Sequence, residues 1–134
     1  MEAIKVVARF ADNRLIKGYT QDFFPNKSLF HIHPVDSAGA KEGIEILVKD
    51  LKALFFVRDF QGNPDYDESK EFGPKEQISG RKVEVAFLDG EVLVGTTLGY
   101  EPKRPGFFLH PLDPKSNNIR VFVVSQAVHN VRFL

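Results

Sequence analysis

Two histidines of this chain lie in a motif that occurs twice. The stretch 29–36 reads LFHIHPVD and the stretch 106–113 reads GFFLHPLD, so each has His-Pro-hydrophobic-Asp behind aromatic residues. Because imidazole binds metals and titrates near neutral pH, His33 and His110 are candidates for metal or acid–base chemistry. A proline that ends a strand and an aspartate that satisfies turn amides account for the same letters. We favour this structural interpretation, since the motif is kept in both stretches while its surroundings differ.

A second arrangement of histidines is suited to metal binding. His31 and His33 are two residues apart, so a strand would present both on one face, with Asp36 nearby. Zinc and nickel accept such ligands, but a catalytic zinc normally has three protein ligands, and the residue equivalent to His31 in the second stretch is Phe108. We therefore predict no metal site and no bound cofactor.

Basic residues beside aromatic ones are the other pattern that suggests chemistry. Lys103 and Arg104 precede Phe107 and Phe108, and Lys27 lies in the equivalent loop of the first part of the chain. Positive groups contact phosphate and aromatic rings stack on bases, so these three cations are the candidate ligand-binding residues for a nucleotide or RNA. Solvated loop charges fit the same letters, and the 18 basic and 18 acidic residues balance, without the basic stripe typical of nucleic-acid binders.

Covalent catalysis has little support in the sequence. The chain has no cysteine, no Gly-x-Ser-x-Gly motif and no glycine-rich phosphate loop. Asp12, Asp36, Asp89 and Asp113 lie in expected turns, where local hydrogen bonding explains them. We therefore predict no catalytic residue and expect that the protein is not an enzyme.

Length and composition indicate a globular protein without a membrane segment. The chain has 134 residues, of which 43% are hydrophobic, enough for one ordinary domain or two very small ones. No apolar run approaches the length that spans a bilayer, and the start, MEAIKVVARF, lacks the basic and apolar regions of a signal peptide. We expect a cytoplasmic protein that does not bind a membrane.

The elements that must position these residues occur twice, because the chain is an internal duplication. An offset of 77 aligns residues 4–57 with residues 81–134 without a gap. Internal similarity at a fixed spacing indicates one structural unit used twice. The identical pairs are Lys5/Lys82, Val6/Val83, Phe10/Phe87, Asp12/Asp89, Gly18/Gly95, Thr20/Thr97, Pro25/Pro102, Phe30/Phe107, His33/His110, Pro34/Pro111, Asp36/Asp113 and Phe56/Phe133.

Each copy predicts five short β-strands and no helix. Apolar residues alternate in KVEVAF, and the following LDGE contains an Asp-Gly hairpin turn. Gly95, matched by Gly18, lies in the middle of the next strand, where a glycine favours the sharp bend of a small sheet that curls on itself. We therefore predict an all-β fold of two tandem five-stranded small barrels packed together. The barrels span residues 1–58 and 81–134, and a long polar, acidic linker spans residues 59–80.

The hairpin of each copy resembles a known signature. Residues 83–101 read VEVAFLDGEVLVGTTLGYE, with alternating apolar residues, Asp-Gly, a glycine after four further residues, and then an aromatic residue followed by an acid. Residues 6–24 read VVARFADNRLIKGYTQDFF and keep a fainter version. The pattern resembles the first signature segment of the Sm-like proteins, which are SH3-like small barrels. The resemblance implies the barrel fold, and duplicated barrels of this kind resemble accessory modules of bacterial signalling proteins.

The resemblance does not extend to the residues with which Sm-like proteins bind RNA. That family typically forms rings that bind uridine- or adenine-rich RNA, using an asparagine on the third strand and an Arg-Gly or Lys-His pair in a second signature segment. The corresponding stretches here read PKRPGFF for the asparagine position, and VVSQAV and LVKDLK for the second segment. We therefore carry over the barrel and none of the RNA-contacting residues.

An apolar outer face on the second copy predicts a contact surface. Phe108, Phe122 and Val124 lie on the strand face opposite the expected core. Burying each of them could contribute about 1.5 to 3 kcal/mol, so this face requires a cover. We expect the other barrel, the linker or a second subunit to cover it, and these three residues are the candidate interface.

Two functions are consistent with the sequence. The first is a non-catalytic binding or adapter module that acts through contact with a protein partner or through self-association as a homo-oligomer. The alternative is a divergent Sm-like protein that binds RNA or a nucleotide through Lys27, Lys103 and Arg104. Salt-sensitive binding that weakens when Lys103 and Arg104 are replaced would favour the alternative.

Overall fold

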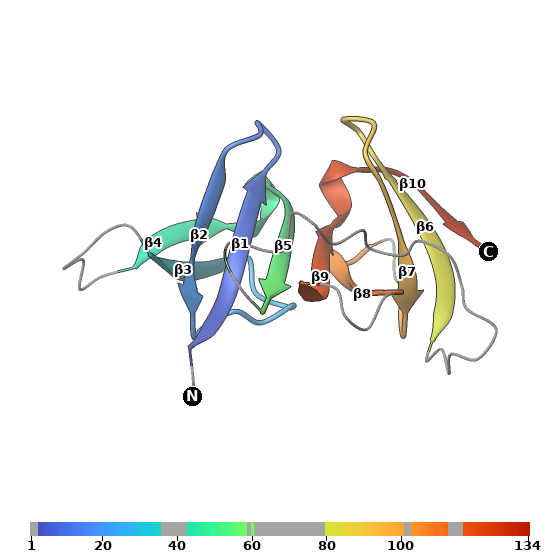
Figure 1. Ribbon diagram of the computed structural model, residues 1–134. Coiled ribbons are helices and arrows are strands. Elements are labelled where there is room, and N and C mark those ends of the chain that lie inside the picture. The colour runs from blue at the N-terminus through green and yellow to red at the C-terminus, as the bar shows by residue number, and fades with distance from the viewer. Residues whose placement is uncertain (1–2, 36–42, 59, 61–79, 101–102, 113–116) are drawn as a thin grey trace.

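The structure, a computed structural model, describes residues 3–35, 43–58, 60, 80–100, 103–112 and 117–134. In this part of the chain the fold is all-β, with two short 3-10 helices and no α-helix. The first half of the chain, residues 4–57, contributes β1 (Ile4–Phe10), β2 (Leu15–Thr20), β3 (Leu29–Pro34), β4 (Ile44–Leu47), η1 (Val48–Asp50) and β5 (Leu51–Val57). The second half, residues 81–134, contributes β6 (Arg81–Phe87), β7 (Val92–Thr97), β8 (Gly106–Pro111), β9 (Asn118–Val124), η2 (Ser125–Ala127) and β10 (Val128–Phe133) (Figure 1).

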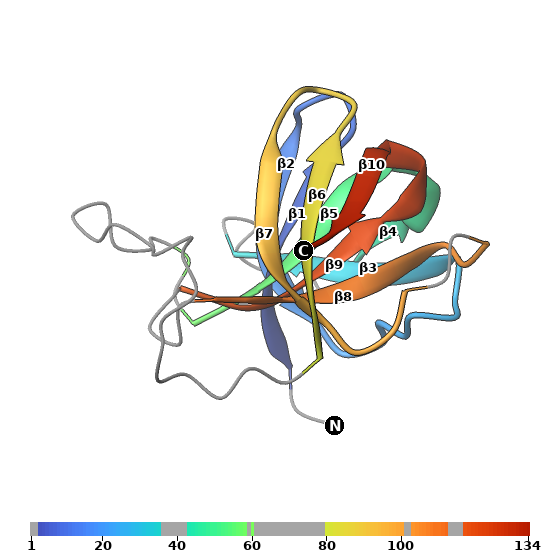
Figure 2. The same ribbon diagram turned by 90° about the vertical axis from the view of Figure 1, so that its right-hand side faces the viewer.

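All ten strands belong to one open antiparallel sheet. Its order is β10-β6-β7-β8-β9-β5-β1-β2-β3-β4, so β10 and β4 are the two end strands. Pairing of β5 with β9 joins the halves, and the other strands of each half lie on either side of this pair (Figure 1). Figure 2 is an end-on view, with the second half in front of the first. The chain therefore has one open sheet, where the sequence predicted two tandem five-stranded barrels packed together.

The two halves have the same strand order. It is β5-β1-β2-β3-β4 in the first half and β10-β6-β7-β8-β9 in the second, and a 3-10 helix precedes the last strand of each. The registers also correspond, because Val6 is opposite Gly18 and Val83 is opposite Gly95, positions that are 77 residues apart in the sequence. Residues that align in the sequence therefore occupy equivalent places in the two halves.

Gly18 and Gly95 lie where neighbouring strands come closest. A Cβ atom at Gly18 would be 2.4 Å from the backbone oxygen of His33, and a Cβ atom at Gly95 would be 2.3 Å from that of His110. No side chain fits at such distances, so glycine is required for β2 to approach β3 and for β7 to approach β8.

Each half has its own cluster of buried side chains. Alternate residues of β1 and β6 point inward, and Val6 and Val83 have no exposed surface. The cluster of the first half also contains Phe122 and Val124 from the second half, and the cluster of the second half contains Ala53 from the first. The two cores therefore meet at the junction of β5 and β9.

Parts of the sequence predictions fall outside the described residues. The linker 59–80 is described at Phe60 but not through its middle, and the ring of Phe60 packs edge-on against Tyr19 with centroids 5.4 Å apart. Asp36 and Asp113, the aspartates of the two His-Pro motifs, are also outside. Among the residues that are described, no helix is long and apolar enough to cross a bilayer.

Candidate functional site

The predicted interface residues are covered by the first half of the same chain. Phe122 and Val124 are each 1% exposed and belong to the core cluster of the first half, and Phe108 packs against that cluster. Because β9 pairs with β5, the outward face of β9 meets the first half rather than solvent. Phe122 and Val124 are therefore buried within the chain, and Phe108 is partly buried.

An aromatic side chain from the β2–β3 loop fills the junction. Phe23 makes edge-on contacts with Phe30 and Phe56 of the first half and with Phe108 and Phe122 of the second, with ring centroids 5.0 to 6.5 Å apart. Edge-to-face contacts of this kind are a favoured geometry for aromatic pairs. The loop that carries Phe23 is thus held against both halves.

A buried lysine of the first half is paired with carboxylates of the second. The Lys52 ammonium is 2.7 Å from a carboxylate oxygen of Asp89 and donates a hydrogen bond to Glu91, and it lies 4.7 Å from the ring centroid of Phe87. Lys52 is 3% exposed. Hydrogen bonds from the Lys52 side chain and from the Glu91 backbone lower the pKa of Asp89. This ion pair fastens the β6–β7 turn to β5.

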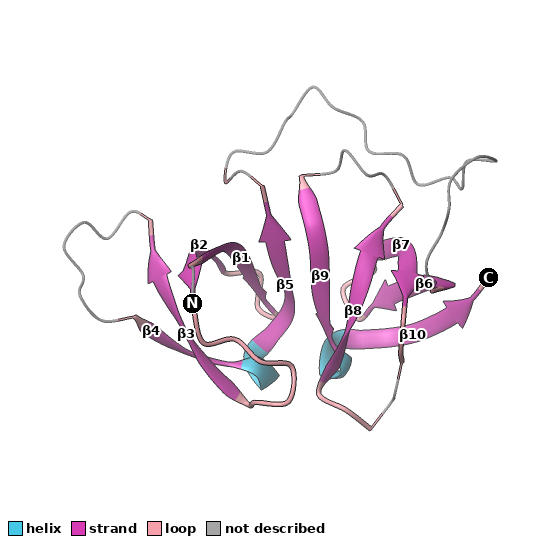
Figure 3. Cartoon of the chain, turned by 90° about the horizontal axis from the view of Figure 1, so that it is seen from below, coloured by secondary structure: helices cyan, strands magenta, loops and turns pink. Residues whose placement is uncertain are grey.

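A groove of about 500 Å³ lies at the junction of the halves. Lys103 and Arg104 line it from the β7–β8 loop, and Lys49 of η1 brings a third cation from the first half. The two 3-10 helices face each other at this end of the junction (Figure 3). The other lining residues are Ser28, Val48, Pro105, Val124, Ser125 and Gln126.

Two of the three predicted ligand-binding cations line the groove, and the third does not. Lys27 is exposed and lies 4.9 Å from the ring centroid of Phe24, although its neighbour Ser28 lines the groove. The aromatic residues next to the basic pair are also placed differently from expectation. Phe107 is buried in the second core, and Phe108 is half-buried against the first half, with the Arg120 guanidinium 4.4 Å from its ring centroid.

Sequence reasoning missed four polar residues of the groove, which are Ser28, Lys49, Ser125 and Gln126. Lys49 and Gln126 are equivalent in the duplication, as are Lys27 and Arg104. The groove is therefore built from the same two connections of each half, the one between the second and third strands and the 3-10 helix. Aligning the loops and 3-10 helices of the two copies, and not only their strands, would have identified these residues as neighbours.

A second hollow, of about 290 Å³, adjoins the groove. Lys49 and Gln126 line both. Beyond them the walls are mainly apolar, and the polar groups there are Lys52 and Asp89, which are paired with each other. The apolar lining residues are Ala11, Leu51, Phe87, Leu88 and Ala127.

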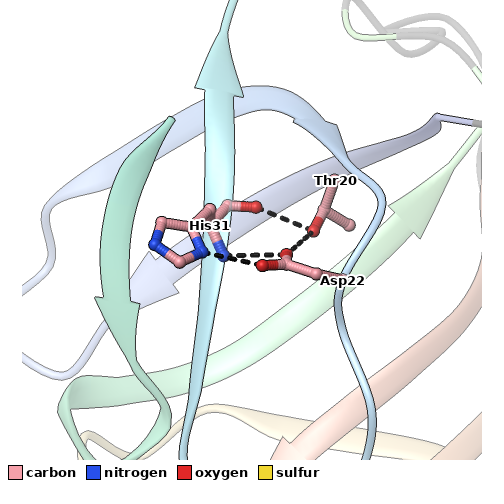
Figure 4. Close-up of polar contacts among 3 residues, drawn as sticks. All are labelled: Thr20, Asp22 and His31. Atoms are coloured by element: carbon pink, nitrogen blue, oxygen red, sulfur yellow. Dashed lines mark hydrogen bonds and ion pairs between the residues drawn. The ribbon is translucent and has the colours of Figure 1, made fainter. Parts of the chain in front are cut away.

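A polar cluster of Thr20, Asp22 and His31 lies at the end of the β2–β3 ladder (Figure 4). The Asp22 carboxylate is 2.7 Å from Nδ1 of His31 and accepts a 2.9 Å hydrogen bond from its backbone N–H, while the Thr20 hydroxyl donates to the His31 carbonyl oxygen at 2.8 Å. The paired residues of β2 and β3 end with Tyr19 and His33. Side chains of Thr20 and Asp22 therefore replace the next backbone partner of β3.

His31 stabilises the ionised form of Asp22. Partial burial raises the pKa of Asp22, but hydrogen bonds from the backbone and side chain of His31 outweigh this effect and lower the pKa below its usual 3.8. Both side chains are 43% exposed. The equivalent residues of the second half are Gly99 and Phe108, so this pair occurs in the first half alone.

The two histidines of the repeated motif are the penultimate residues of their strands. His33 and His110 are half-buried near the ends of β3 and β8. Within the residues that the structure describes, no group of three or more His, Cys, Asp or Glu side chains could hold a metal ion.

The chain belongs to a family whose function is not known. A family model described as "Family of unknown function (DUF6982)" matches residues 2–134. No curated protein and no solved structure matches the chain. Membership in this family assigns no activity.

Proposed function

We propose that this member of the family is a non-catalytic binding module that holds an anionic ligand in the groove between its halves. The observation that carries the proposal is the meeting of Lys49, from the first half, with Lys103 and Arg104, from the second, around one hollow. Its volume of about 500 Å³ is in the usual range for small-ligand sites. Ammonium and guanidinium groups are common partners of phosphate oxygens, so a phosphate-bearing ligand fits best.

The positive charge is local to the groove. The chain has a net charge of zero, so no long-range field attracts a polyanion. Lys49, Lys103 and Arg104 are all exposed, and within the described residues neither Lys49 nor Arg104 forms an ion pair. A small ligand with one or two phosphates is therefore favoured over RNA, which would require a basic track beyond the groove.

We also propose that each half is a small barrel of the Sm-like kind, in tandem with the other. Support comes from the strand order common to both halves, from the glycine contacts in β2 and β7, and from the 3-10 helix before each last strand. In this proposal each half curls around its own core cluster as an open barrel. It stays open because β4 does not pair with β5, and β9 does not pair with β10.

The proposal is for binding without catalysis. The polar side chains of the groove are those of lysine, arginine, serine and glutamine, which hold an anion by charge and hydrogen bonds. The Asp22–His31 pair, which is the arrangement closest to an acid–base dyad, does not line the groove or the adjoining hollow.

Titration with inorganic pyrophosphate, followed by calorimetry at low and high salt, tests the site. We expect one-to-one binding that weakens with salt, and we expect Arg104→Ala to weaken it about tenfold because a charge-assisted contact is lost. Lys27→Ala is the matched control, since it removes the equivalent cation of the first half, which does not line the groove. Equal binding by the wild-type and Arg104→Ala proteins would overturn the proposal.

A second candidate function is association with a protein partner, including another copy of the chain, at the open ends of the sheet. β4 and β10 each have one neighbouring strand. They are equivalent by the offset of 77 to β9 and β5, which pair at the junction. The same pairing between molecules would place β10 of one chain beside β4 of the next.

Contact between molecules would be weaker than the internal junction, because Glu45 and His31 replace Phe122 and Phe108 on the outer face of the first half. We therefore expect Glu45→Phe to increase self-association, measured as molar mass by light scattering after size-exclusion chromatography. The control is Leu98→Phe, at a 75% exposed position outside both end strands. A Glu45→Phe protein that stays monomeric at high concentration would remove this candidate.

A further inference from the structure

The groove and its adjoining hollow form a depression with one cationic end and one apolar end. Lys103 and Arg104 are at the first end, and Lys49 and Gln126 stand between the two hollows and line both. At the far end the walls are mainly apolar, and Leu88, in the β6–β7 turn, is 67% exposed there. A ligand that filled the whole depression would therefore meet positive charge at one end and apolar surface at the other.

The charged groups at the apolar end balance one another. The Lys52 ammonium is paired with both Asp89 and Glu91, and the charge of Arg9 also lowers the pKa of Asp89, so two carboxylates face two cations. Lys52 is buried and its charge is taken up by these partners, so it offers little to a ligand. Beyond Lys49, this end therefore offers little positive charge to a second anionic group of a ligand.

We propose that the ligand of the groove is an amphipathic phosphate monoester, with its phosphate among Lys49, Lys103 and Arg104 and its apolar or aromatic group in the hollow beside Leu88. This inference rests on the proposed function and adds the chemical class and the orientation of the ligand. The phosphate gains charge-assisted hydrogen bonds at one end, and the apolar group leaves water at the other. Volumes of about 500 and 290 Å³ accommodate a headgroup and a ring or short alkyl chain.

A nucleic-acid strand fits this depression less well than a monoester. Its phosphates recur along the chain, so that a second phosphate would reach the mainly apolar end, where Lys52 is already paired with carboxylates. A nucleoside monophosphate and an alkyl phosphate each have one anionic group and one large remaining group. Both ligands are phosphate monoesters, and they differ in whether a nucleoside or an alkyl chain would contact Leu88.

Calorimetric titration with four probes tests the inference. The probes are inorganic phosphate, phenyl phosphate, adenosine 5′-monophosphate, and octyl phosphate below its micelle concentration. We expect phenyl phosphate, and one or both of the two larger monoesters, to bind at least about tenfold more tightly than inorganic phosphate, because they bury an apolar group. Tighter binding of adenosine 5′-monophosphate than of octyl phosphate would indicate a nucleotide ligand, and the reverse would indicate a lipid-like ligand.

The variant Leu88→Asn tests whether the apolar group of the ligand binds beside Leu88. It should remove most of the advantage of the monoesters and leave the affinity for inorganic phosphate nearly unchanged. The backbone N–H of Leu88 donates to the Ala127 oxygen at 2.9 Å, a bond that does not need the leucine side chain, so the variant should fold. Leu98→Asn is the matched control at an exposed leucine that lines neither hollow.

The outcomes separate this inference from the proposed function. If phosphate and pyrophosphate bind but the monoesters bind no more tightly, the amphipathic ligand is wrong and the anionic groove stands. If the advantage of the monoesters survives in Leu88→Asn as it does in Leu98→Asn, the placement of the apolar group is wrong. An RNA oligonucleotide that binds more tightly than every monoester would overturn the ligand class, and a failure of all anions to bind would overturn both proposals.

Discussion

Lys52 joins the two halves through a buried charge. Removing an ammonium from water costs several kcal/mol, and here Asp89, Glu91 and the ring of Phe87 offset that cost. The equivalent residue of the second half is the exposed His129, so the interaction occurs only at the junction. Loss of the carboxylates is more harmful than loss of the ammonium, because the ammonium would stay buried without a partner whereas both carboxylates are partly exposed to water.

Removing the charge from one side of this ion pair should therefore lower the free energy of unfolding more than removing it from the other side. Asp89→Asn combined with Glu91→Gln should lower the free energy of unfolding by about 2 kcal/mol, below the value for a fully buried pair because both carboxylates are partly exposed. Lys52→Met should cost less than about 1 kcal/mol, since an apolar side chain of similar length fills the space. Urea unfolding measures both, and an equal loss in the two proteins would contradict the asymmetry.

Two variants of Asp22 separate the roles of its carboxylate. Asp22→Asn keeps an oxygen that can accept from the His31 backbone N–H, whereas Asp22→Ala keeps none. We expect the alanine variant to be about 1 kcal/mol less stable than the asparagine variant, because a half-buried backbone donor loses its partner. Asp50→Ala, which removes an exposed carboxylate from η1, is the control in the same urea series. If the two Asp22 variants match, the carboxylate does not replace a strand partner.

Glycine determines how closely two pairs of strands approach. Gly95→Ala would place a Cβ atom 2.3 Å from the His110 backbone oxygen, so β7 and β8 must move apart. We expect a loss of about 3 kcal/mol in the free energy of unfolding, as for overpacked cores. Gly99→Ala is a matched control, because nothing lies within 4 Å of its Cβ position and the substitution should be close to neutral. Thermal unfolding of both variants checks the difference.

The β2–β3 loop shows how an irregular connection can serve two surfaces. Thr20 and Asp22 anchor its start on β3, Phe23 fills the junction, and Ser28 at its end lines the groove. In the second half the Thr97 hydroxyl donates instead to the Gly99 carbonyl oxygen at 3.1 Å. The two copies of one connection have thus acquired different hydrogen bonds.

For the molecule as a whole, the junction should make the two halves unfold together. Phe122 belongs to the second half and is buried in the core of the first, where its ring contacts Phe23 and Phe108, so Phe122→Ala removes packing across the junction. We expect a loss of about 3 to 5 kcal/mol and a single unfolding transition. Hydrogen exchange followed on β1 and on β6 is the measurement. Faster exchange in β1 alone, with β6 unaffected, would show that the halves are energetically independent.

Acid should weaken the folded state through its hydrogen-bonded aspartates. Asp12, Asp22 and Asp89 all have lowered pKa values, so the unfolded chain takes up protons at a higher pH than the folded one. The stability that these groups contribute is present above the ordinary pKa of 3.8 and is lost as the pH falls through the lower folded values. The Asp22→Asn, Asp89→Asn double variant should have a shallower fall in unfolding free energy between about pH 5 and pH 3, measured by urea titration at each pH. A slope equal to that of the wild type would show that other carboxylates control acid stability.

Features that depend on neighbouring residues could be read from the sequence. Alternating apolar residues, the Asp89-Gly90 turn and the strand glycines predict an all-β fold, because strand pleating and turn conformation act over a few residues. The duplication predicts equivalent loops, and two of the three predicted cations line the groove. The local pattern also indicated that the face with Phe108 and Phe122 requires a cover.

The identity of that cover, and the partners of the charged residues, depended on the tertiary structure. Pairing of β5 with β9 brings together residues that are about 70 positions apart, such as Leu54 and Phe122, and it joins two sheets into one. In the folded chain, Lys49 and Arg104 line the same groove. A period of two residues tells which side chains share a strand face, but not which other strand that face will meet. The choice is made by the fit of whole surfaces, and no short stretch of sequence contains it.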